Sequence, residues 1–182
     1  EKGDRIAIQS PNILQYPVAL FGAMMAGLTI VNTNPLYTPP ELKHQVNDSG
    51  AKVILVLANF AYNLEKVLHE TSVEHVIITE LGDLIGGFKG ALTNFVVKNV
   101  KKMVPAYSIP NAIKFKDAMN KGAKLTLNKV EMSSDDIAFL QYTGGTTGVS
   151  KGAMLTHRNV IANMIQVNTW IGITLEDNKE TV

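Results

Sequence analysis

Short runs rich in valine and isoleucine alternate along this chain with longer stretches of helical periodicity, and this alternation constrains the fold most. Over the first 80 residues the order is strand, helix, strand, helix, strand, helix, strand. That order at this spacing predicts βαβ units on a parallel sheet. The predicted strands are RIAIQS (5–10), TIVNTN (29–34), KVILVLA (52–58), EHVIITE (74–80) and, further along, DIAFLQYT (136–143).

The run VILVL is apolar at every position, which is expected of a strand covered by helices on both faces. The predicted fold class is therefore α/β, a mainly parallel sheet layered with helices. Helices are predicted over residues 12–27, 38–50, 61–71 and 156–172. Thr38 and Thr156 are the expected N-caps of two of them, and Gly50 ends the helix that Thr38 begins.

Length and composition limit the classes of protein that this chain could represent. Its 182 residues suffice for one domain or for part of a larger one. A net charge of +1 gives no general attraction to nucleic acid, and the absence of cysteine excludes disulfides and cysteine metal sites. Because the sequence has no initiator methionine and stops within a charged stretch, we expect a fragment of a longer protein.

The segment from residue 84 to 124 interrupts the alternation and is strongly basic, with eight lysines against one acid, Asp117. Residues 92–104 place Leu92, Val96, Val100 and Met103 near one face of a helix that Pro105 would end. One interpretation is contact with an anionic lipid surface. We favour the simpler interpretation, an exposed helix that packs on its own sheet.

Residues 142–152, YTGGTTGVSKG, combine four glycines, three threonines and one lysine after a predicted strand and before a predicted helix. Glycine lets backbone N–H groups approach a phosphate closely, threonine adds small donors, and lysine adds charge. The carboxyl end of a strand is also where open α/β sheets bind ligands. The loop is not a Walker A motif, G-x-x-x-x-G-K-S/T, because two residues separate Gly148 from Lys151. The plain alternative is a surface turn.

The stretch YTGGTTGVSKGAMLTHRN resembles the phosphate loop of the adenylate-forming enzymes, whose usual form is Y-T-S-G-T-T-G-x-P-K-G. Gly144 replaces the usual serine, which removes a hydroxyl, and Ser150 replaces the usual proline, which should loosen the turn before Lys151. Upstream, NPLYTPPEL and HQVNDSGAK resemble bacterial long-chain fatty-acid–CoA ligases, as does the basic insert 84–124. The resemblance covers essentially residues 1–182, as part of the large N-terminal AMP-binding domain; the C-terminal domain of the family is absent.

The resemblance implies an enzyme that activates a long-chain fatty acid with ATP to an acyl-adenylate and then transfers the acyl group to coenzyme A. ATP and Mg²⁺ are the implied cofactors, and the fatty acid and coenzyme A the other substrates. Lys151 would act catalytically by neutralising the departing pyrophosphate; otherwise it is a solvated lysine. Thr143 would help to place Mg²⁺; otherwise it is a strand-end threonine. The implied phosphate-binding residues are Thr143, Gly144, Gly145, Thr146, Thr147, Gly148 and Lys151.

Several other polar residues have structural roles as the favoured interpretation. His157 and Arg158 begin a helix and could touch phosphate, but we expect Thr156 and His157 to cap the helix and pack on the loop. Asp135 and Asp136 should cap the start of a strand. The remaining histidines share no metal-ligand spacing, so we interpret them as surface or core residues: His44, His69 and His75.

Much of the family's active site, including its Y-G-x-T-E motif, is absent from the sequence, so we expect the fragment alone to be inactive. The alternatives are adenylation of an aryl, medium-chain or amino acid, and a non-catalytic nucleotide-binding module. For the full-length enzyme the resemblance suggests a cytoplasmic location, with peripheral contact at the inner face of the cell membrane and a homodimer as further expectations. No nucleic-acid partner is expected.

Overall fold

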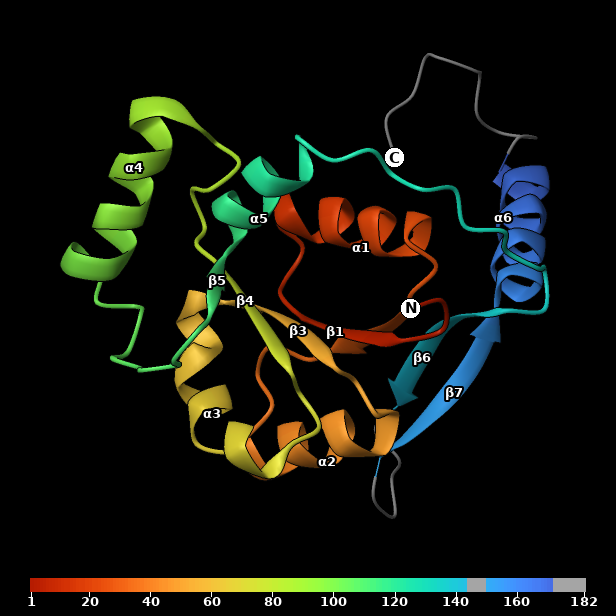
Figure 1. Ribbon diagram of the computed structural model, residues 1–182, viewed down its shortest axis with the longest axis horizontal. Coiled ribbons are helices and arrows are strands. Elements are labelled where there is room, and N and C mark those ends of the chain that lie inside the picture. The colour runs from red at the N-terminus through yellow and green to blue at the C-terminus, as the bar shows by residue number, and fades with distance from the viewer. Residues whose placement is uncertain (144–149, 172–182) are drawn as a thin grey trace.

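A seven-stranded sheet is the framework of the protein in the computed structural model, which describes residues 1–143 and 150–171 (Figure 1). Its strand order is β5-β4-β3-β1-β2-β6-β7, and all neighbours are parallel except β6 and β7. The strands are β1 (Arg5–Gln9), β2 (Thr29–Thr33), β3 (Val53–Leu57), β4 (His75–Thr79), β5 (Ile113–Lys114), β6 (Ile137–Thr143) and β7 (Lys151–Thr156). The predicted α/β class with a mainly parallel sheet is confirmed.

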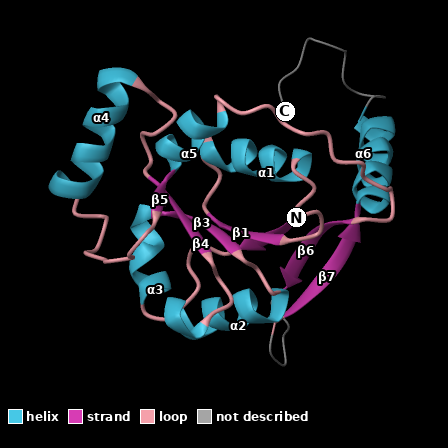
Figure 2. Ribbon diagram, viewed as in Figure 1, coloured by secondary structure: helices cyan, strands magenta, loops and turns pink. Residues whose placement is uncertain are grey.

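Helices lie on both sides of this sheet (Figure 2). In the view of Figure 1, α1 and α5 lie above the sheet and α2 and α3 below it. The α-helices are α1 (Gln15–Met25), α2 (Pro39–Ser49), α3 (Ala61–Glu65), α4 (Gly87–Phe95), α5 (Phe115–Gly122) and α6 (His157–Ile171). Short 3-10 helices span Ala58–Phe60 and Leu68–Glu70, and a π-helix spans Val96–Val100.

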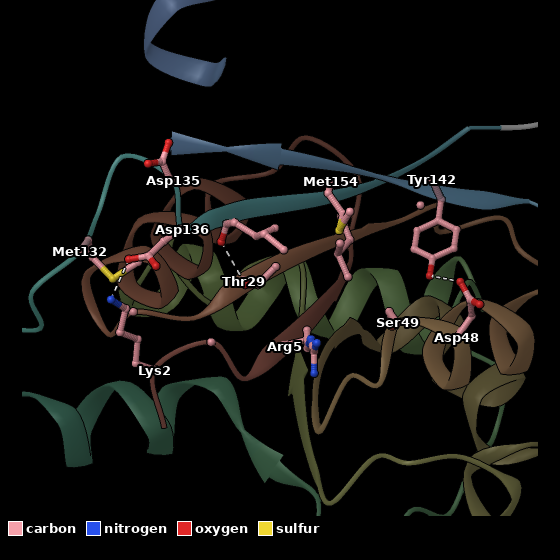
Figure 3. A pocket seen from close by; sticks show the side chains of 15 residues that line it. Lys2, Arg5, Thr29, Asp48, Ser49, Met132, Asp135, Asp136, Tyr142 and Met154 are labelled. Carbon is pink, nitrogen blue, oxygen red and sulfur yellow. Dashed lines mark hydrogen bonds and ion pairs between the residues drawn. The ribbon is translucent and has the colours of Figure 1, made fainter. Parts of the chain in front are cut away.

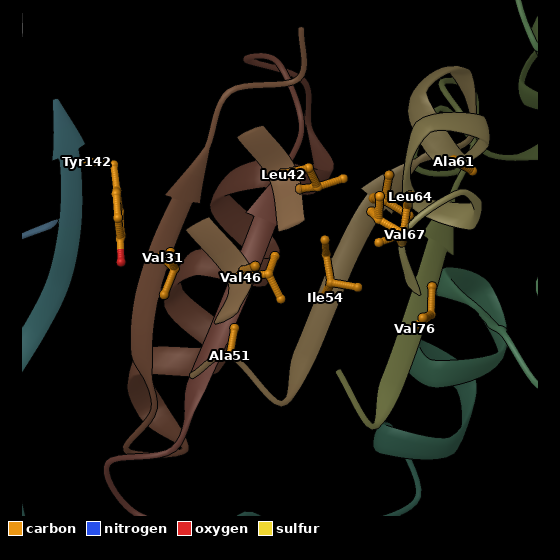
Figure 4. Packing of buried hydrophobic residues seen from close by; sticks show 12 residues of the cluster. Val31, Leu42, Val46, Ala51, Ile54, Ala61, Leu64, Val67, Val76 and Tyr142 are labelled. Atoms are coloured by element: carbon orange, nitrogen blue, oxygen red, sulfur yellow. The ribbon is translucent and has the colours of Figure 1, made fainter. Parts of the chain in front are cut away.

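Side chains that alternate along the central strands pack into two hydrophobic clusters, one on each face of the sheet. Ile54 and Val56 belong to the cluster beneath α2 and α3, and Leu55 belongs to the cluster beneath α1 and α5. Figure 4 shows the first cluster, with Leu42 and Val46 of α2 packed over the strands. The all-apolar run VILVL is therefore buried on both sides, as predicted.

The predicted boundaries of α2 are confirmed in detail. Thr38 donates from its hydroxyl and its backbone N–H to the Glu41 carboxylate, at 2.6 and 2.8 Å, and forms a capping box with it. Gly50 ends the helix with a φ of 63°, a left-handed conformation that glycine adopts at little cost. These two ends fix the length and orientation of α2, on which the site described below depends.

The single helix predicted over residues 61–71 is wrong. The chain forms α3, a break, and then the 3-10 helix Leu68–Glu70. Ala61 and Leu64 are buried in α3, and Val67 is buried in the break that follows it. In this break Val67 N–H donates to the Leu64 carbonyl at 3.0 Å, a three-residue hydrogen bond in place of the α-helical one.

The basic segment 84–124 contains α4, its π-helical continuation, β5 and α5. The helix predicted over residues 92–104 begins earlier, at Gly87, and the structure leaves Leu92, Val100 and Met103 47%, 61% and 57% exposed. Their apolar face is therefore not buried against the sheet, contrary to the favoured interpretation. By contrast, α5 sends Phe115 into the core.

Candidate functional site

The topological switch of the sheet lies between β1 and β2. The chain leaves β1 towards α1 on one face and leaves β2 towards α2 on the other (Figure 1). In open α/β sheets, the crevice beyond the carboxyl ends of such strands is the usual ligand site. A cavity of about 410 Å³ lies there. Its lining residues are Ile8, Ser10, Asn12, Tyr16, Asn32, Thr33, Asn34, Tyr37, Gln141 and Tyr142.

A chain of side-chain hydrogen bonds crosses this cavity on the α1 face. The Tyr16 hydroxyl donates to Asn32 Oδ1 at 2.8 Å, and Asn32 Nδ2 donates to Gln141 Oε1 at 3.0 Å. Gln45 Nε2, from α2, donates to the Asn32 carbonyl at 2.9 Å. Partial burial raises the pKa of Tyr16, so its phenol stays a neutral donor. The bonds fix the Gln141 side chain at the end of β6, where the Gly/Thr segment begins.

The Gly/Thr segment joins two antiparallel strands, β6 and β7, and the predicted helix, α6, follows directly after β7. Thr143 ends β6 and pairs directly with Lys151, the first residue of β7. The predicted phosphate-binding residues Gly144, Gly145, Thr146, Thr147 and Gly148 lie outside the described residues. The carboxyl edge of the parallel strands therefore carries a hairpin base, defined here as Tyr142, Thr143 and Ser150–Gly152.

Thr143 and Lys151, the two described residues of the predicted set, are both exposed and directly opposite each other. Because side chains alternate along a strand, Thr143 lies on the same face of the sheet as Gln141, and cross-strand pairing puts Lys151 there too. Both side chains therefore face the side on which the hydrogen-bonded chain of the cavity lies. Within residues 1–143 and 150–171, the Lys151 ammonium makes no ion pair.

The pair Tyr142 and Gly152 gives a physical reason for glycine at the end of the motif. They are paired across the hairpin, and a Cβ on Gly152 would lie 2.9 Å from Tyr142 Cε2. Only glycine leaves room for this ring, which is 8% exposed. The Tyr142 hydroxyl donates to Asp48 Oδ2 of α2 at 2.5 Å, as Figure 3 shows.

Ser150 stands where adenylate-forming enzymes usually have proline, and its side chain partly replaces the rigidity that proline would give the turn. Its hydroxyl donates to the Thr143 carbonyl at 3.1 Å, which links the two strands at the base of the segment. Proline could not form this bond. The looser turn expected from the sequence is therefore countered by a hydrogen bond across the hairpin base.

His44 is a residue at this site whose place the sequence did not reveal. Its Nε2 lies 3.0 Å from the Ser150 carbonyl, although the two residues are 106 positions apart. A carbonyl only accepts hydrogen bonds, so Nε2 carries the proton in this contact. The interpretation of His44 as a plain surface or core residue is incomplete, because it contacts the hairpin base.

Thr156 and Asp136 have the structural roles that we expected, whereas Asp135 pairs with Arg158 instead of capping the strand. Asn159 N–H donates to the Thr156 hydroxyl at 3.2 Å, so Thr156 is the N-cap of α6. Asp136 accepts from the Ser133 N–H at 2.6 Å just before β6. Arg158 donates to the Asp135 carboxylate at 2.9 and 3.0 Å and thus anchors α6 instead of reaching the cavity.

His69 and His75 lie apart from the site. His69 is near Glu70, at 3.6 Å, with 76% of its side chain exposed, and His75 is an exposed residue at the start of β4. In the part of the chain that the structure describes, no three acidic or histidine side chains gather into a metal-binding group. The interpretation of these two histidines as surface residues fits their exposure.

A second cavity, of about 470 Å³, extends from the edge of the sheet where β1, β2 and β6 begin to Tyr142 and Gly152 of the hairpin base (Figure 3). Arg5, Thr29 and Met154 line it, and Lys2 forms a 2.7 Å ion pair with Asp136 beside it. Most of its lining lies towards the amino ends of the parallel strands, and neither Thr143 nor Lys151 lines it. We therefore place the functional site at the other edge, although this cavity is the larger one.

The Tyr142–Asp48 contact gives a testable titration. Burial, the hydrogen bond to Asp48 and the charge of Asp48 all raise the pKa of Tyr142 above the ordinary 10.0. The neutral phenol is thus favoured in the fold, and its contribution to stability is complete below about pH 10 and is lost as pH rises through the folded pKa. In Asp48→Asn the charge is gone, so we expect the tyrosinate absorbance of Tyr142 to develop at lower pH.

Subtracting the titration curve of Tyr142→Phe from each curve isolates this residue. Asp117→Asn, at an exposed position on α5, is the matched control and should leave the curve unchanged. A Tyr142 midpoint that is the same with Asp48 and with asparagine would mean that the carboxylate does not bond to the phenol in solution.

Comparison with known proteins places this architecture in a family. Residues 1–181 match the model of the AMP-binding enzyme family. The chain is 57% identical over its full length to a long-chain-fatty-acid–CoA ligase of Escherichia coli O157:H7, and 36% identical over 94% of its length to one of Bacillus subtilis. It covers 32% and 30% of those proteins, so the chain spans about a third of the curated relatives it matches.

Solved structures agree with this result. A crystal structure of a long-chain-fatty-acid-CoA ligase (FadD1) from Archaeoglobus fulgidus matches with a TM-score of 0.71 at 28% identity, over 94% of this chain and 29% of that one. An anthranilate CoA ligase, solved with anthranoyl-AMP, matches at a TM-score of 0.70 and 21% identity, over 92% of this chain and 28% of that one, and supports the fold alone. The chain belongs to the AMP-binding enzyme family.

Proposed function

We propose that the full-length protein that contains this chain activates a long-chain fatty acid. In the first step a fatty carboxylate oxygen attacks the α-phosphorus of ATP, and the bond to the β-phosphate oxygen breaks, giving acyl-adenylate and pyrophosphate. In the second, the thiolate of coenzyme A attacks the acyl carbon and AMP leaves, giving the thioester. The observation that carries this proposal is the 57% identity with a long-chain-fatty-acid–CoA ligase together with the hairpin base at the switch-point cavity.

The hairpin base suits the first of these steps. Negative charge moves onto the departing pyrophosphate, and positioned cations and N–H donors stabilise such charge more than they stabilise the ground state. Lys151, exposed on the cavity face, would supply the charge, and the Thr143 hydroxyl opposite it a polar ligand. Gly144, Gly145, Thr146, Thr147 and Gly148 would supply backbone donors, as the sequence predicts.

Magnesium fits this arrangement as a partner of ATP. The described residues hold no carboxylate cluster, and Mg²⁺ is commonly bound through substrate phosphates with few protein ligands. The Thr143 hydroxyl is the residue of the hairpin base that we propose beside the metal. When bound, the metal would neutralise phosphate charge during adenylation.

Product analysis tests the substrate class. The longest natural polypeptide that contains this sequence would be given ATP, Mg²⁺ and coenzyme A with palmitate, octanoate, coumarate or mixed amino acids. We expect palmitoyl-CoA and equal amounts of AMP, with little product from the other acids. A thioester formed only from coumarate or octanoate would keep the chemistry and overturn the long-chain assignment. The 182-residue chain alone should form none.

We further propose that this enzyme works at the cytoplasmic face of a membrane, through α4. Phe88, Leu92 and Phe95 form one stripe along that helix and are 81%, 47% and 57% exposed. Lysines flank the stripe, and no helix of the described residues is long and apolar enough to span a bilayer. An apolar stripe with flanking lysines suits the surface of a membrane that contains anionic lipid.

Vesicle cosedimentation of the full-length protein tests this contact. Replacing Lys98, Lys101 and Lys102 with glutamine should weaken binding to phosphatidylglycerol vesicles by about 100-fold, since each lysine near such a surface contributes about 1 kcal/mol. The same change at three lysines outside the helix, Lys43, Lys66 and Lys129, is the charge-matched control. Equal losses in the two variants would rule out α4 as the contact.

A further inference from the structure

One face of α2 points at the hairpin base. His44 and Asp48 are four residues apart in α2, so their side chains lie one turn apart on the same side of the helix. His44 Nε2 contacts the Ser150 carbonyl at 3.0 Å, and Asp48 Oδ2 accepts from the Tyr142 hydroxyl at 2.5 Å. One helix thus holds both strands of the hairpin, β6 through Tyr142 and the start of β7 through Ser150.

A third contact links these two attachments. The Ser150 hydroxyl donates to the carbonyl of Thr143, the residue after Tyr142, at 3.1 Å. The Ser150 backbone therefore accepts from α2 while its side chain bonds to β6. The result is a closed set of three hydrogen bonds around the hairpin base, which we call the α2 clamp: His44–Ser150, Ser150–Thr143 and Tyr142–Asp48.

The clamp lies on the face of the sheet opposite to Thr143 and Lys151. Tyr142 packs in the cluster beneath α2, whereas its neighbours Gln141 and Thr143 point to the other side. His44 is not among the residues that line the switch-point cavity. It can therefore act on a ligand at Lys151 only through the backbone that it holds.

Both ends of α2 are capped, so the helix holds His44 and Asp48 in fixed positions next to the hairpin base. Its N-terminus is fixed by the Thr38–Glu41 capping box and its C-terminus by Gly50, while Leu42, Gln45, Val46 and Ser49 are buried against the sheet. A side chain on a helix that is fixed in this way loses little conformational entropy when it forms a hydrogen bond. Its hydrogen bond therefore stabilises the hairpin base more than the same bond from a mobile segment would.

We propose that His44 is a positioning residue for ATP binding, which acts with Asp48 to hold the hairpin base so that Thr143 and Lys151 keep one geometry when the triphosphate arrives. This inference rests on the proposed adenylation. It assigns a role to the HxxxD spacing in HQVND (44–48), which the sequence alone did not explain. Ordering of the hairpin before binding lowers the cost of binding ATP and should affect its KM more than kcat.

Steady-state kinetics of the full-length protein test this role. In His44→Ala we expect the KM for MgATP to rise about tenfold, with kcat within about threefold of the parent and the KM for fatty acid unchanged, as for the loss of one hydrogen bond. His44→Gln, whose amide can donate to the same carbonyl, should recover most of the affinity. His69→Ala, at an exposed histidine away from the site, is the matched control and should show no change.

A proline at residue 150 provides a second, independent test. Ser150→Pro removes the Ser150–Thr143 hydrogen bond but restricts the backbone at the hairpin base without the help of His44. The effect of His44→Ala on KM should therefore shrink to about threefold in that background. Additive effects of the two substitutions, or a histidine-to-alanine change that lowers kcat and leaves KM unchanged, would overturn the positioning role.

Backbone hydrogen exchange separates this inference from the proposed activity. Peptides that cover residues 138–143 and 150–156 should exchange faster in His44→Ala and in Asp48→Ala than in the parent, whether or not the protein adenylates fatty acids. Faster exchange in the two variants, together with a parent that shows no adenylation, would support the clamp and reject the function. Unchanged exchange at the hairpin base in both variants would reject the clamp even if the parent is an active ligase.

Discussion

Lys151→Met in the full-length protein should lower the rate of fatty-acid-dependent pyrophosphate exchange by about 100-fold, because loss of one positioned charge-stabilising group commonly costs a factor of 10² to 10³. Lys151 opens β7, is exposed on the cavity face, and makes no ion pair within the described residues. Its removal therefore breaks no described contact of the fold. We expect the melting temperature to be within about 1 °C of the parent, since surface changes of this kind are usually worth less than about 0.5 kcal/mol.

Two further substitutions make this prediction sharp. Lys129→Met removes an exposed lysine whose ion pair within residues 1–143 and 150–171 is with the exposed Glu131 at 2.9 Å, and should leave exchange unchanged. Lys151→Arg keeps the charge but alters its shape, and we expect a partial recovery. If Lys151→Met exchanged pyrophosphate at the parental rate, the lysine would be a solvated surface residue and its proposed role would be wrong.

Gly152→Ala should destabilise the hairpin base, because the new Cβ would lie 2.9 Å from Tyr142 Cε2 and 3.0 Å from Cζ. The ring has little room to move, since it is buried and its hydroxyl is bonded to Asp48. Overpacking of this kind costs about 1–3 kcal/mol, which corresponds to a fall of about 5 °C in melting temperature for a domain of this size. The displaced strand should also weaken MgATP binding.

A double-mutant comparison isolates the clash. Tyr142→Leu removes the ring, so Gly152→Ala should cost much less in that background than in the parent. Gly122→Ala, at a glycine where no atom lies within 4 Å of an added Cβ, is the control and should change the melting temperature little. An equal cost for Gly152→Ala with and without the Tyr142 ring would show that the ring is not what requires glycine there.

Much of the fold could be predicted from the sequence because the patterns that mark its strands and helices lie within short segments. The strands β1 to β4 each have β-branched residues, β6 has an apolar and aromatic run, and α2 has its capping threonine and terminal glycine. Each of these elements could therefore be recognised within a few residues. The parallel order then follows from strand–helix alternation.

The elements that were missed lack such signals. β7 begins KGAMLT, without a run of β-branched residues, and is held in place by β6 instead of by its own propensity. β5 has only two residues, Ile113 and Lys114. The contact of His44 with Ser150 joins positions 106 residues apart, so it could not be predicted from a spacing along the chain. The site residues Thr143 and Lys151 were found from their motif, whereas the helix that supports them became visible only in the fold.

The most direct measurement of the central claim is exchange of labelled pyrophosphate into ATP, by the longest natural polypeptide that contains this sequence, without coenzyme A. Adenylation is reversible, so an enzyme that forms acyl-adenylate incorporates label only when its acid is present. We predict exchange with palmitate that is about 100-fold slower in Lys151→Met. Absence of exchange with palmitate and with every other carboxylic acid tried would contradict the account, because the hairpin at the switch point would then hold nucleotide for some purpose other than adenylation.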